Sequence, residues 1–157
     1  MSGYEDFQIL EHMTFIRTLY ENSPAQYVLC GGDWLNTNHT LTTAKYRGGR
    51  VPNLIRNRIC EKAYTVIGNH DLNVEAPNPA SAYLTETQLA KLWYDSDVGY
   101  YTVDTNETTC YMFDSGNQNK SMTPYRWTQV DWFATHLLSN QKPHLFGLIH
   151  IIGRLET

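Results

Sequence analysis

Apolar residues recur along this chain at two spacings, one typical of helices and one typical of strands. Between residues 4 and 20, Ile9, Met13, Ile16 and Leu19 recur every three or four positions, which predicts an amphipathic helix. The same spacing predicts a helix opened by Pro52, one near residues 86–94 and one over residues 124–138.

Short runs rich in apolar, β-branched and aromatic residues lie between these helices and predict the strands. The runs are QYVLC at residues 26–30, AYTVI at residues 63–67 and HLFGLIHII at residues 144–152. The first two stop at Gly31 and Gly68. Strands that alternate with helices indicate an α/β fold, in which binding sites commonly lie at the strand ends.

The remaining segments are consistent with a single domain over residues 1–157. Residues 99–117 alternate and turn around residues 105–107, which predicts a β-hairpin. The polar residues from 36 to 43 predict a loop that follows the first strand. No internal repeat or interdomain linker interrupts this order.

Composition and charge exclude several classes of protein. Hydrophobic residues make up 41% of the chain, which is enough for a buried core. The net charge of -4, with 12 scattered Lys and Arg, argues against nucleic acid as a partner but permits a small phosphorylated substrate. The sequence shows neither a membrane span nor a signal peptide. No apolar run reaches the roughly 18 residues that a membrane span needs. Charged residues near the N-terminus argue against a signal peptide, so the chain as given is expected in the cytoplasm. Secretion is the alternative if the true N-terminus lies upstream.

Side chains that bind metals or move protons follow the predicted strands. Asp33 comes after the first strand, Asn69, His70 and Asp71 come after the second, and His150 lies in the last. Divalent metals bind carboxylate and amide oxygens together with imidazole nitrogen. Each piece alone has a simpler interpretation, since an Asn-His-Asp turn often bonds its own backbone and a lone strand histidine is often a core residue. Together and in this order, these residues predict a metal site.

In these motifs the sequence resembles the calcineurin-like metallophosphoesterase superfamily. That family has the pattern D-x-H, G-D, G-N-H-[DE], a lone His and G-H-x-H. Here GGDWLN is similar to the second block, IGNHD matches the third, and GLIHII is similar to the fourth. The resemblance covers about residues 26–151, and G-N-H-D is its most specific element.

The resemblance implies an αββα four-layer sandwich with two divalent metal ions, Mn, Fe or Zn, at one end. The implied activity is hydrolysis of a phosphate ester, on a small molecule or a protein, by a hydroxide that the metals hold. Whether the chain is itself an enzyme depends on whether its site has all the ligands.

Carried over by position, the family's roles fall on five residues. Asp33 would bridge the two metals, and Asn69 and His150 would bind the second metal. His70 would protonate the leaving-group oxygen or stabilise its charge. Asp71 would orient His70 through a carboxylate–imidazole hydrogen bond.

Two of the family's blocks have no counterpart in this sequence. No D-x-H precedes Asp33, and no G-H-x-H occurs anywhere. The resemblance therefore implies a truncated domain that lacks its first strand and its C-terminal segment and that holds one metal or none. A missing strand would leave sheet edges exposed, so self-association is also expected.

Two other interpretations stay open. The chain could be a non-catalytic phosphoesterase-like remnant that binds at most one metal. It could also be an unrelated mononuclear metalloprotein in which Asp33 and His150 meet. The substrate, the choice between mono- and diester, the metal and the oligomeric state are not encoded in these motifs.

Overall fold

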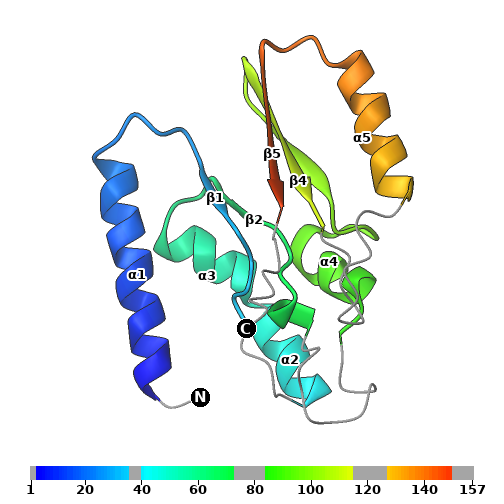
Figure 1. Cartoon of the computed structure of the whole chain (residues 1–157). Helices are drawn as coiled ribbons and strands as arrows, with labels where there is room; N and C mark the ends of the chain where they lie inside the picture. Colours follow the sequence, from blue (N-terminus) through cyan, green and yellow to red (C-terminus); the bar gives the residue numbers. More distant parts are fainter. Residues whose placement is uncertain (1–2, 36–39, 73–83, 115–126, 150–157) are drawn as a thin grey trace, which may run out of the picture.

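The computed structural model describes residues 3–35, 40–72, 84–114 and 127–149. The helices in this part of the chain are α1 (Gly3–Glu21), α2 (Leu41–Gly48), α3 (Val51–Arg58), α4 (Glu86–Tyr94) and α5 (Trp127–Ser139), with a 3-10 turn η1 (His70–Leu72). The strands are β1 (Val28–Cys30), β2 (Ala63–Thr65), β3 (Tyr101–Asp104), β4 (Thr108–Phe113) and β5 (His144–Ile149) (Figure 1).

The strands form two small sheets, so the predicted mixed α/β class is confirmed. β1 and β2 pair in parallel, with Val28 opposite Ala63. In the second sheet, β4 lies in the middle and pairs antiparallel with β3 and parallel with β5. The antiparallel pair is the predicted hairpin, with Asp104 opposite Thr109 next to the turn.

The prediction of a loop over residues 36–43 is partly wrong, because the helix α2 begins inside this segment at Leu41. Thr40 supplies the N-cap: its side-chain oxygen accepts a hydrogen bond from the backbone N–H of Thr43 at 3.3 Å. Ala44 is fully buried, so a short apolar contact secures the helix although its sequence is polar. The other helices predicted from apolar spacing are present as α1, α3, α4 and α5.

A first core joins the helices to one face of the β1–β2 sheet. Strand residues that alternate along the chain point to opposite faces, and Cys30 and Ala63 belong to this face. They pack with Met13 of α1, Ile55 of α3 and Leu89 of α4, all of which are buried. Each fully buried aliphatic side chain of this kind stabilises the fold by about 1.5–3 kcal/mol.

A second core lies between the two sheets. Val66, which directly follows β2, is buried together with Val103 of β3 and with Cys110 and Met112 of β4. Leu29, Tyr64, Tyr101 and Leu148 pack around this group and are partly buried. The two sheets therefore share an apolar interior, with β1 and β2 on one side and the hairpin and β5 on the other.

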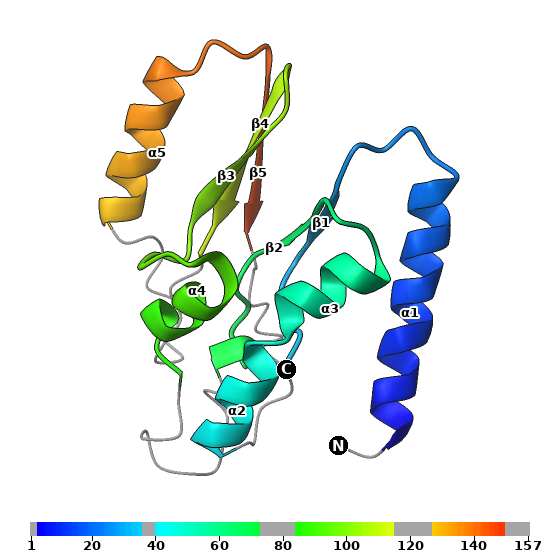
Figure 2. The same cartoon turned by 180° about the vertical axis from the view of Figure 1, so that it is seen from behind.

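The outer face of the second sheet is covered by α5, as both views of the ribbon show (Figure 2). Tyr111 and Phe113 of β4 point to this face, opposite to Cys110 and Met112. The ring of Phe133 in α5 meets them edge-on, with centroid distances of 4.9 Å to Tyr111 and 5.2 Å to Phe113. Edge-to-face pairs at these distances are favourable beyond their buried area.

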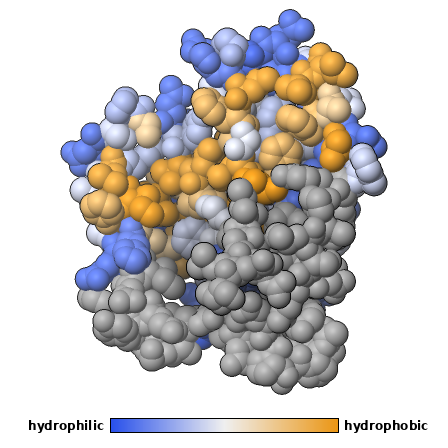
Figure 3. Space-filling model, viewed as in Figure 1, coloured by the Kyte–Doolittle hydropathy of each residue, from blue (hydrophilic) through white to orange (hydrophobic). Residues whose placement is uncertain are grey.

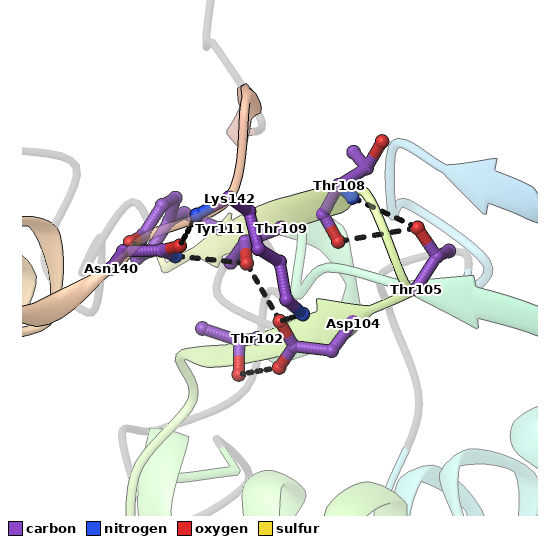
Figure 4. A network of polar contacts seen from close by, with 8 residues as sticks. All are labelled: Thr102, Asp104, Thr105, Thr108, Thr109, Tyr111, Asn140 and Lys142. Atoms are coloured by element: carbon purple, nitrogen blue, oxygen red, sulfur yellow. Dashed lines mark hydrogen bonds and ion pairs between the residues drawn. The ribbon is translucent and has the colours of Figure 1, made fainter.

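A polar network fixes the segment between α5 and β5 to the hairpin (Figure 4). Asp104 accepts hydrogen bonds from Thr102 and Thr109 and forms an ion pair with Lys142. Asn140 donates to the Thr109 hydroxyl at 2.9 Å and to the Tyr111 hydroxyl at 3.1 Å.

Apolar side chains remain exposed on several elements. Phe15 and Leu19 of α1, Leu138 of α5 and Phe146 of β5 are all more than half exposed. Hydrophobic surface accordingly extends over much of the described part of the face shown in Figure 3. In the described residues, no helix has the length and apolar character needed to cross a lipid bilayer.

Candidate functional site

The loops that follow β1 and β2 meet through backbone conformations that glycine favours. Gly32 has a φ of +86°, and Asp33 follows with a φ of 59°. A Cβ atom on Gly32 would lie 2.6 Å from the backbone nitrogen of Gly68 and 2.8 Å from the carbonyl oxygen of Val66. Only a residue without a side chain lets the two loops approach this closely.

The second glycine of this contact is Gly68, which follows β2. A Cβ atom there would lie 2.1 Å from a carboxylate oxygen of Asp33 and 2.5 Å from its backbone nitrogen. The chain thus packs the Asp33 carboxylate directly against the Gly68 backbone. Two parallel strands and two glycines place Asp33 beside the Gly68–Asp71 segment.

Asp71 ties the two loops together with its carboxylate. One oxygen accepts the backbone N–H groups of Asp33 at 2.8 Å and Gly68 at 2.9 Å. The other accepts those of Trp34 at 2.7 Å and Leu35 at 2.9 Å. Asp71 is fully buried, so these bonds replace the water that an exposed carboxylate would bind.

Two opposing effects act on the acidity of Asp71. Burial raises the pKa of its carboxyl to about 6, whereas the N–H donors of Gly68, Leu35 and Asp33 act to lower it. The carboxyl is therefore ionised at neutral pH. A carboxylate has about four acceptor positions, and four backbone donors already use them. Orientation of His70 by Asp71 stays a prediction, and the imidazole would have to compete with these donors.

His70 and Asn69 lie at the same meeting point of the two loops. The backbone N–H of His70 donates to the Asp33 carboxylate at 3.0 Å. His70 is half-buried and Asn69 is 8% exposed, while Asp33 is exposed to solvent. The structure thus brings together four of the five residues predicted from sequence: Asp33, Asn69, His70 and Asp71.

The fifth predicted residue, His150, lies outside the described residues. β5 ends one position earlier, at Ile149. In both ribbon views β1, β2 and β5 run toward the same end of the molecule (Figures 1 and 2). His144 is at the opposite end of β5, where its backbone N–H donates to the carbonyl of Glu107 in the hairpin turn. His144 therefore lies at the far end of β5 from the position that the sequence predicts to bind the metal.

The sequence did not predict that Asp71 would bond to the first loop. Its backbone donors in that loop are residues 33–35, and no spacing rule links them to position 71. Trp34 adds a second unpredicted link, because its indole N–H donates to the Thr65 hydroxyl at 2.7 Å. The signal that the sequence contains is the run Gly31-Gly32-Asp33, since a Gly-Gly-Asp sequence after a strand favours a tight turn.

The donor atoms at this site are suited to a divalent metal. A carboxylate from Asp33 and an amide oxygen from Asn69 are ligands that Mn, Fe and Zn accept. Within the described residues, no three side chains of His, Cys, Asp or Glu gather as a metal-binding group. The described part of the site therefore offers one carboxylate and one amide.

When the chain is compared with protein-family models, with curated proteins and with solved structures, none of the three comparisons yields a match.

Proposed function

We propose that the loops after β1 and β2 form the metal-binding half of a phosphoester-hydrolysing site. The observation that carries this proposal is the contact of Asp33 with the Gly68–Asp71 segment, in which the His70 N–H donates to the Asp33 carboxylate at 3.0 Å. The Asp33 carboxylate meets the Asn69–His70 segment after the two strands. Carboxylate, amide and imidazole side chains are groups that metal-dependent phosphoester hydrolysis uses.

The αββα four-layer sandwich is part of the proposal. It is supported by the apolar interior that the two sheets share and by the helices on their outer faces. In such a sandwich the ends of strands from both sheets meet along one rim. His150, which follows Ile149 of β5, would then reach the same rim as Asp33 and Asn69.

Each site residue has a distinct role in the proposed reaction. Asp33 and Asn69 would hold a divalent metal, with His150 as a third ligand. The metal would supply Lewis acidity toward the phosphoryl group and a more acidic water. His70 would donate a proton to the oxygen of the leaving group. Asp71 would keep the two loops in register by binding their backbone N–H groups.

The test is hydrolysis of p-nitrophenyl phosphate by the purified chain with Mn²⁺ and with EDTA. Asp33→Asn and His70→Ala are expected to lower the rate by at least about 100-fold, because metal binding and proton donation each contribute about that much. His70→Ala should keep its bound metal. His12→Ala, on the exposed side of α1, is the matched control and should retain the full rate. Turnover that survives Asp33→Asn would refute the proposal.

A second candidate is a non-catalytic protein that binds one metal at the same place. The donor count favours it, since the described part of the site supplies one carboxylate and one amide. This alternative predicts Mn²⁺ binding that Asp33→Asn abolishes, without Mn²⁺-dependent hydrolysis of the aryl ester in the unmodified chain.

A further inference from the structure

A cavity of about 600 Å³ lies between α3, the end of α4 and the outer edge of β2, apart from the candidate metal site. None of Asp33, Asn69 and His70 lines it. Its walls come from α3, from all of β2, from the end of α4 with the residues after it, and from the first residue of β3. Cavities of this size commonly hold small organic molecules.

Hydrogen bonds fix the aromatic walls of this cavity. The hydroxyl groups of Tyr94 and Tyr101 both donate to the carbonyl oxygen of Thr65, at 2.8 and 2.6 Å. The centroids of their rings are 4.6 Å apart. Trp93 is also fixed, because its indole N–H donates to the carbonyl of Gly48 at 2.8 Å. A ligand would therefore meet a wall that is already ordered, which lowers the entropic cost of binding.

The two tyrosine hydroxyls also protect the edge of the sheet. β2 pairs with β1 on one side, so the Thr65 carbonyl points to the other side, toward the cavity. With that acceptor already occupied, an added peptide strand would lack a backbone partner there. The cavity is thus better suited to a small molecule than to an extended peptide.

The charged residues that line the cavity favour a ligand of one sign of charge. Lys91 forms an ion pair with Asp95 at 2.8 Å, so these two charges balance. Within the described residues, the guanidinium of Arg56 takes part in no ion pair, although it lines the cavity. Burial raises the pKa of the Tyr101 hydroxyl, and the charge of Arg56 is near enough to oppose that rise. Arg56 is thus the cation of the cavity lining that has no ion-pair partner among the described residues, and its single charge fits a ligand with one negative charge.

Apolar side chains also line the cavity together with Arg56. Pro52 and Ile55 on α3 and Leu92 on α4 line it together with the aromatic residues, and Leu92 is 43% exposed. A ring placed there would cover apolar surface that water now contacts. Its carboxylate could bind the planar fork of the guanidinium with two parallel hydrogen bonds.

From the cavity, its fixed aromatic walls and its single unbalanced cation, we propose that the chain binds a small aromatic carboxylate between α3 and α4. The carboxylate bonds to Arg56, and the ring lies against Pro52, Leu92 and the tyrosine wall. This proposal is independent of phosphoester hydrolysis and does not need a metal.

The experiment is a titration of the ¹⁵N-labelled full chain with 2-naphthoate, followed by NMR and by calorimetry. Shifts are expected at the backbone amides of Ala63–Thr65 and Lys91–Ser96. Neutral 2-naphthalenemethanol should bind at least about 5-fold more weakly, because it lacks the charge-assisted hydrogen bonds. This comparison needs no variant and therefore does not depend on any variant folding.

A matched pair of variants tests the role of the guanidinium. Arg56→Gln should weaken 2-naphthoate binding by about 5-fold or more, and Arg58→Gln, an equal charge change on the same helix outside the cavity, should leave it within about 2-fold. Equal effects of the two substitutions would overturn the proposal. So would shifts confined to the exposed face of α1, or the absence of shifts at millimolar ligand.

Discussion

Gly32 and Gly68 decide at the residue scale whether the two loops of the candidate site can meet. Each would place a Cβ atom less than 3 Å from the backbone of the opposite loop. Gly31 differs, because a Cβ atom there has nothing within 4 Å. A side chain therefore fits at Gly31 but not at Gly32, and alanine substitutions at the two positions should differ in their effect on stability.

We predict that Gly32→Ala destabilises the fold by about 2 kcal/mol or more, because alanine disfavours a φ of +86° and its Cβ would contact the Gly68 backbone. Gly31→Ala is the control and should change the free energy of unfolding by less than about 0.5 kcal/mol. Urea unfolding of both variants measures the difference. Equal stabilities would mean that the loops do not meet as described.

Asp71 gives a second prediction at this scale. Asp71→Ala would remove the acceptor of four backbone N–H groups in a fully buried position. Buried donors left without partners cost about 1–3 kcal/mol each, so a loss of at least about 3 kcal/mol is expected in urea unfolding. Asp131→Ala, on the exposed side of α5, is the control and should cost less than about 1 kcal/mol. A mild effect of Asp71→Ala would show that Asp71 does not join the loops.

The sequence identified the residues of the candidate site but not their contacts. Asp33, Asn69 and His70 could be predicted because each follows a strand that ends in glycine. The bonds of Asp71 to residues 33–35 could not, because they depend on how two distant loops pack. Every residue except proline carries a backbone N–H, so the partners of these groups cannot be read from residue type.

At the element scale, the apolar spacing that predicted most helices failed for α2. That helix is polar, and its cap at Thr40 and its buried Ala44 secure it. Tertiary contact therefore outweighs the polar composition of the segment. The strands were easier to predict, since β-branched and aromatic runs that end in glycine or turn residues have few other interpretations.

The ion pair of Asp104 with Lys142 gives a pH prediction for the α5–β5 connection. Burial acts to raise the pKa of Asp104, but hydrogen bonds from Lys142, Thr109 and Thr102 more than offset it, so the pKa lies below its usual value. A lowered pKa means that the ionised carboxylate stabilises the fold at neutral pH. This stability is lost as the pH falls below about 4.

Asp104→Asn should therefore be less stable than the unmodified chain at pH 6, by up to about 1 kcal/mol, because the pair is partly exposed. The difference should be smaller at pH 3, because protons bind this carboxyl more readily in the unfolded chain, where its pKa is higher, and this lowers the stability of the unmodified chain. Urea unfolding at both pH values measures it, with Asp131→Asn as the exposed control. A difference that grows at pH 3 would contradict the described network.

At the scale of the whole molecule, the β1–β2 sheet has two strands and carries a core on each of its faces. Two-stranded sheets depend on packing for their stability, and here that packing comes from two cores. Phe146 of β5 remains 59% exposed even though it alternates with Leu145 and lies opposite the buried Cys110. The self-association predicted from the missing sequence blocks stays a prediction, and this exposed surface is its physical basis.

We predict that the chain associates as its concentration rises and that Phe146→Lys reduces the association. A lysine there would place a charge on apolar surface that a neighbouring molecule would bury. Val98→Lys, at a 38% exposed residue outside the sheets, is the matched control. Light scattering coupled to size-exclusion chromatography measures the mass. A monomer at all concentrations would contradict the prediction.

The most direct test of the candidate site is the metal content of the whole chain. Protein purified with Mn²⁺ and Zn²⁺ present and then desalted is analysed for metal per chain, alongside Asp33→Asn and the control Asp131→Asn. The proposed site predicts one metal per chain in the unmodified protein and in Asp131→Asn, and none in Asp33→Asn. Metal retained by Asp33→Asn, or no metal in the unmodified chain, would contradict it.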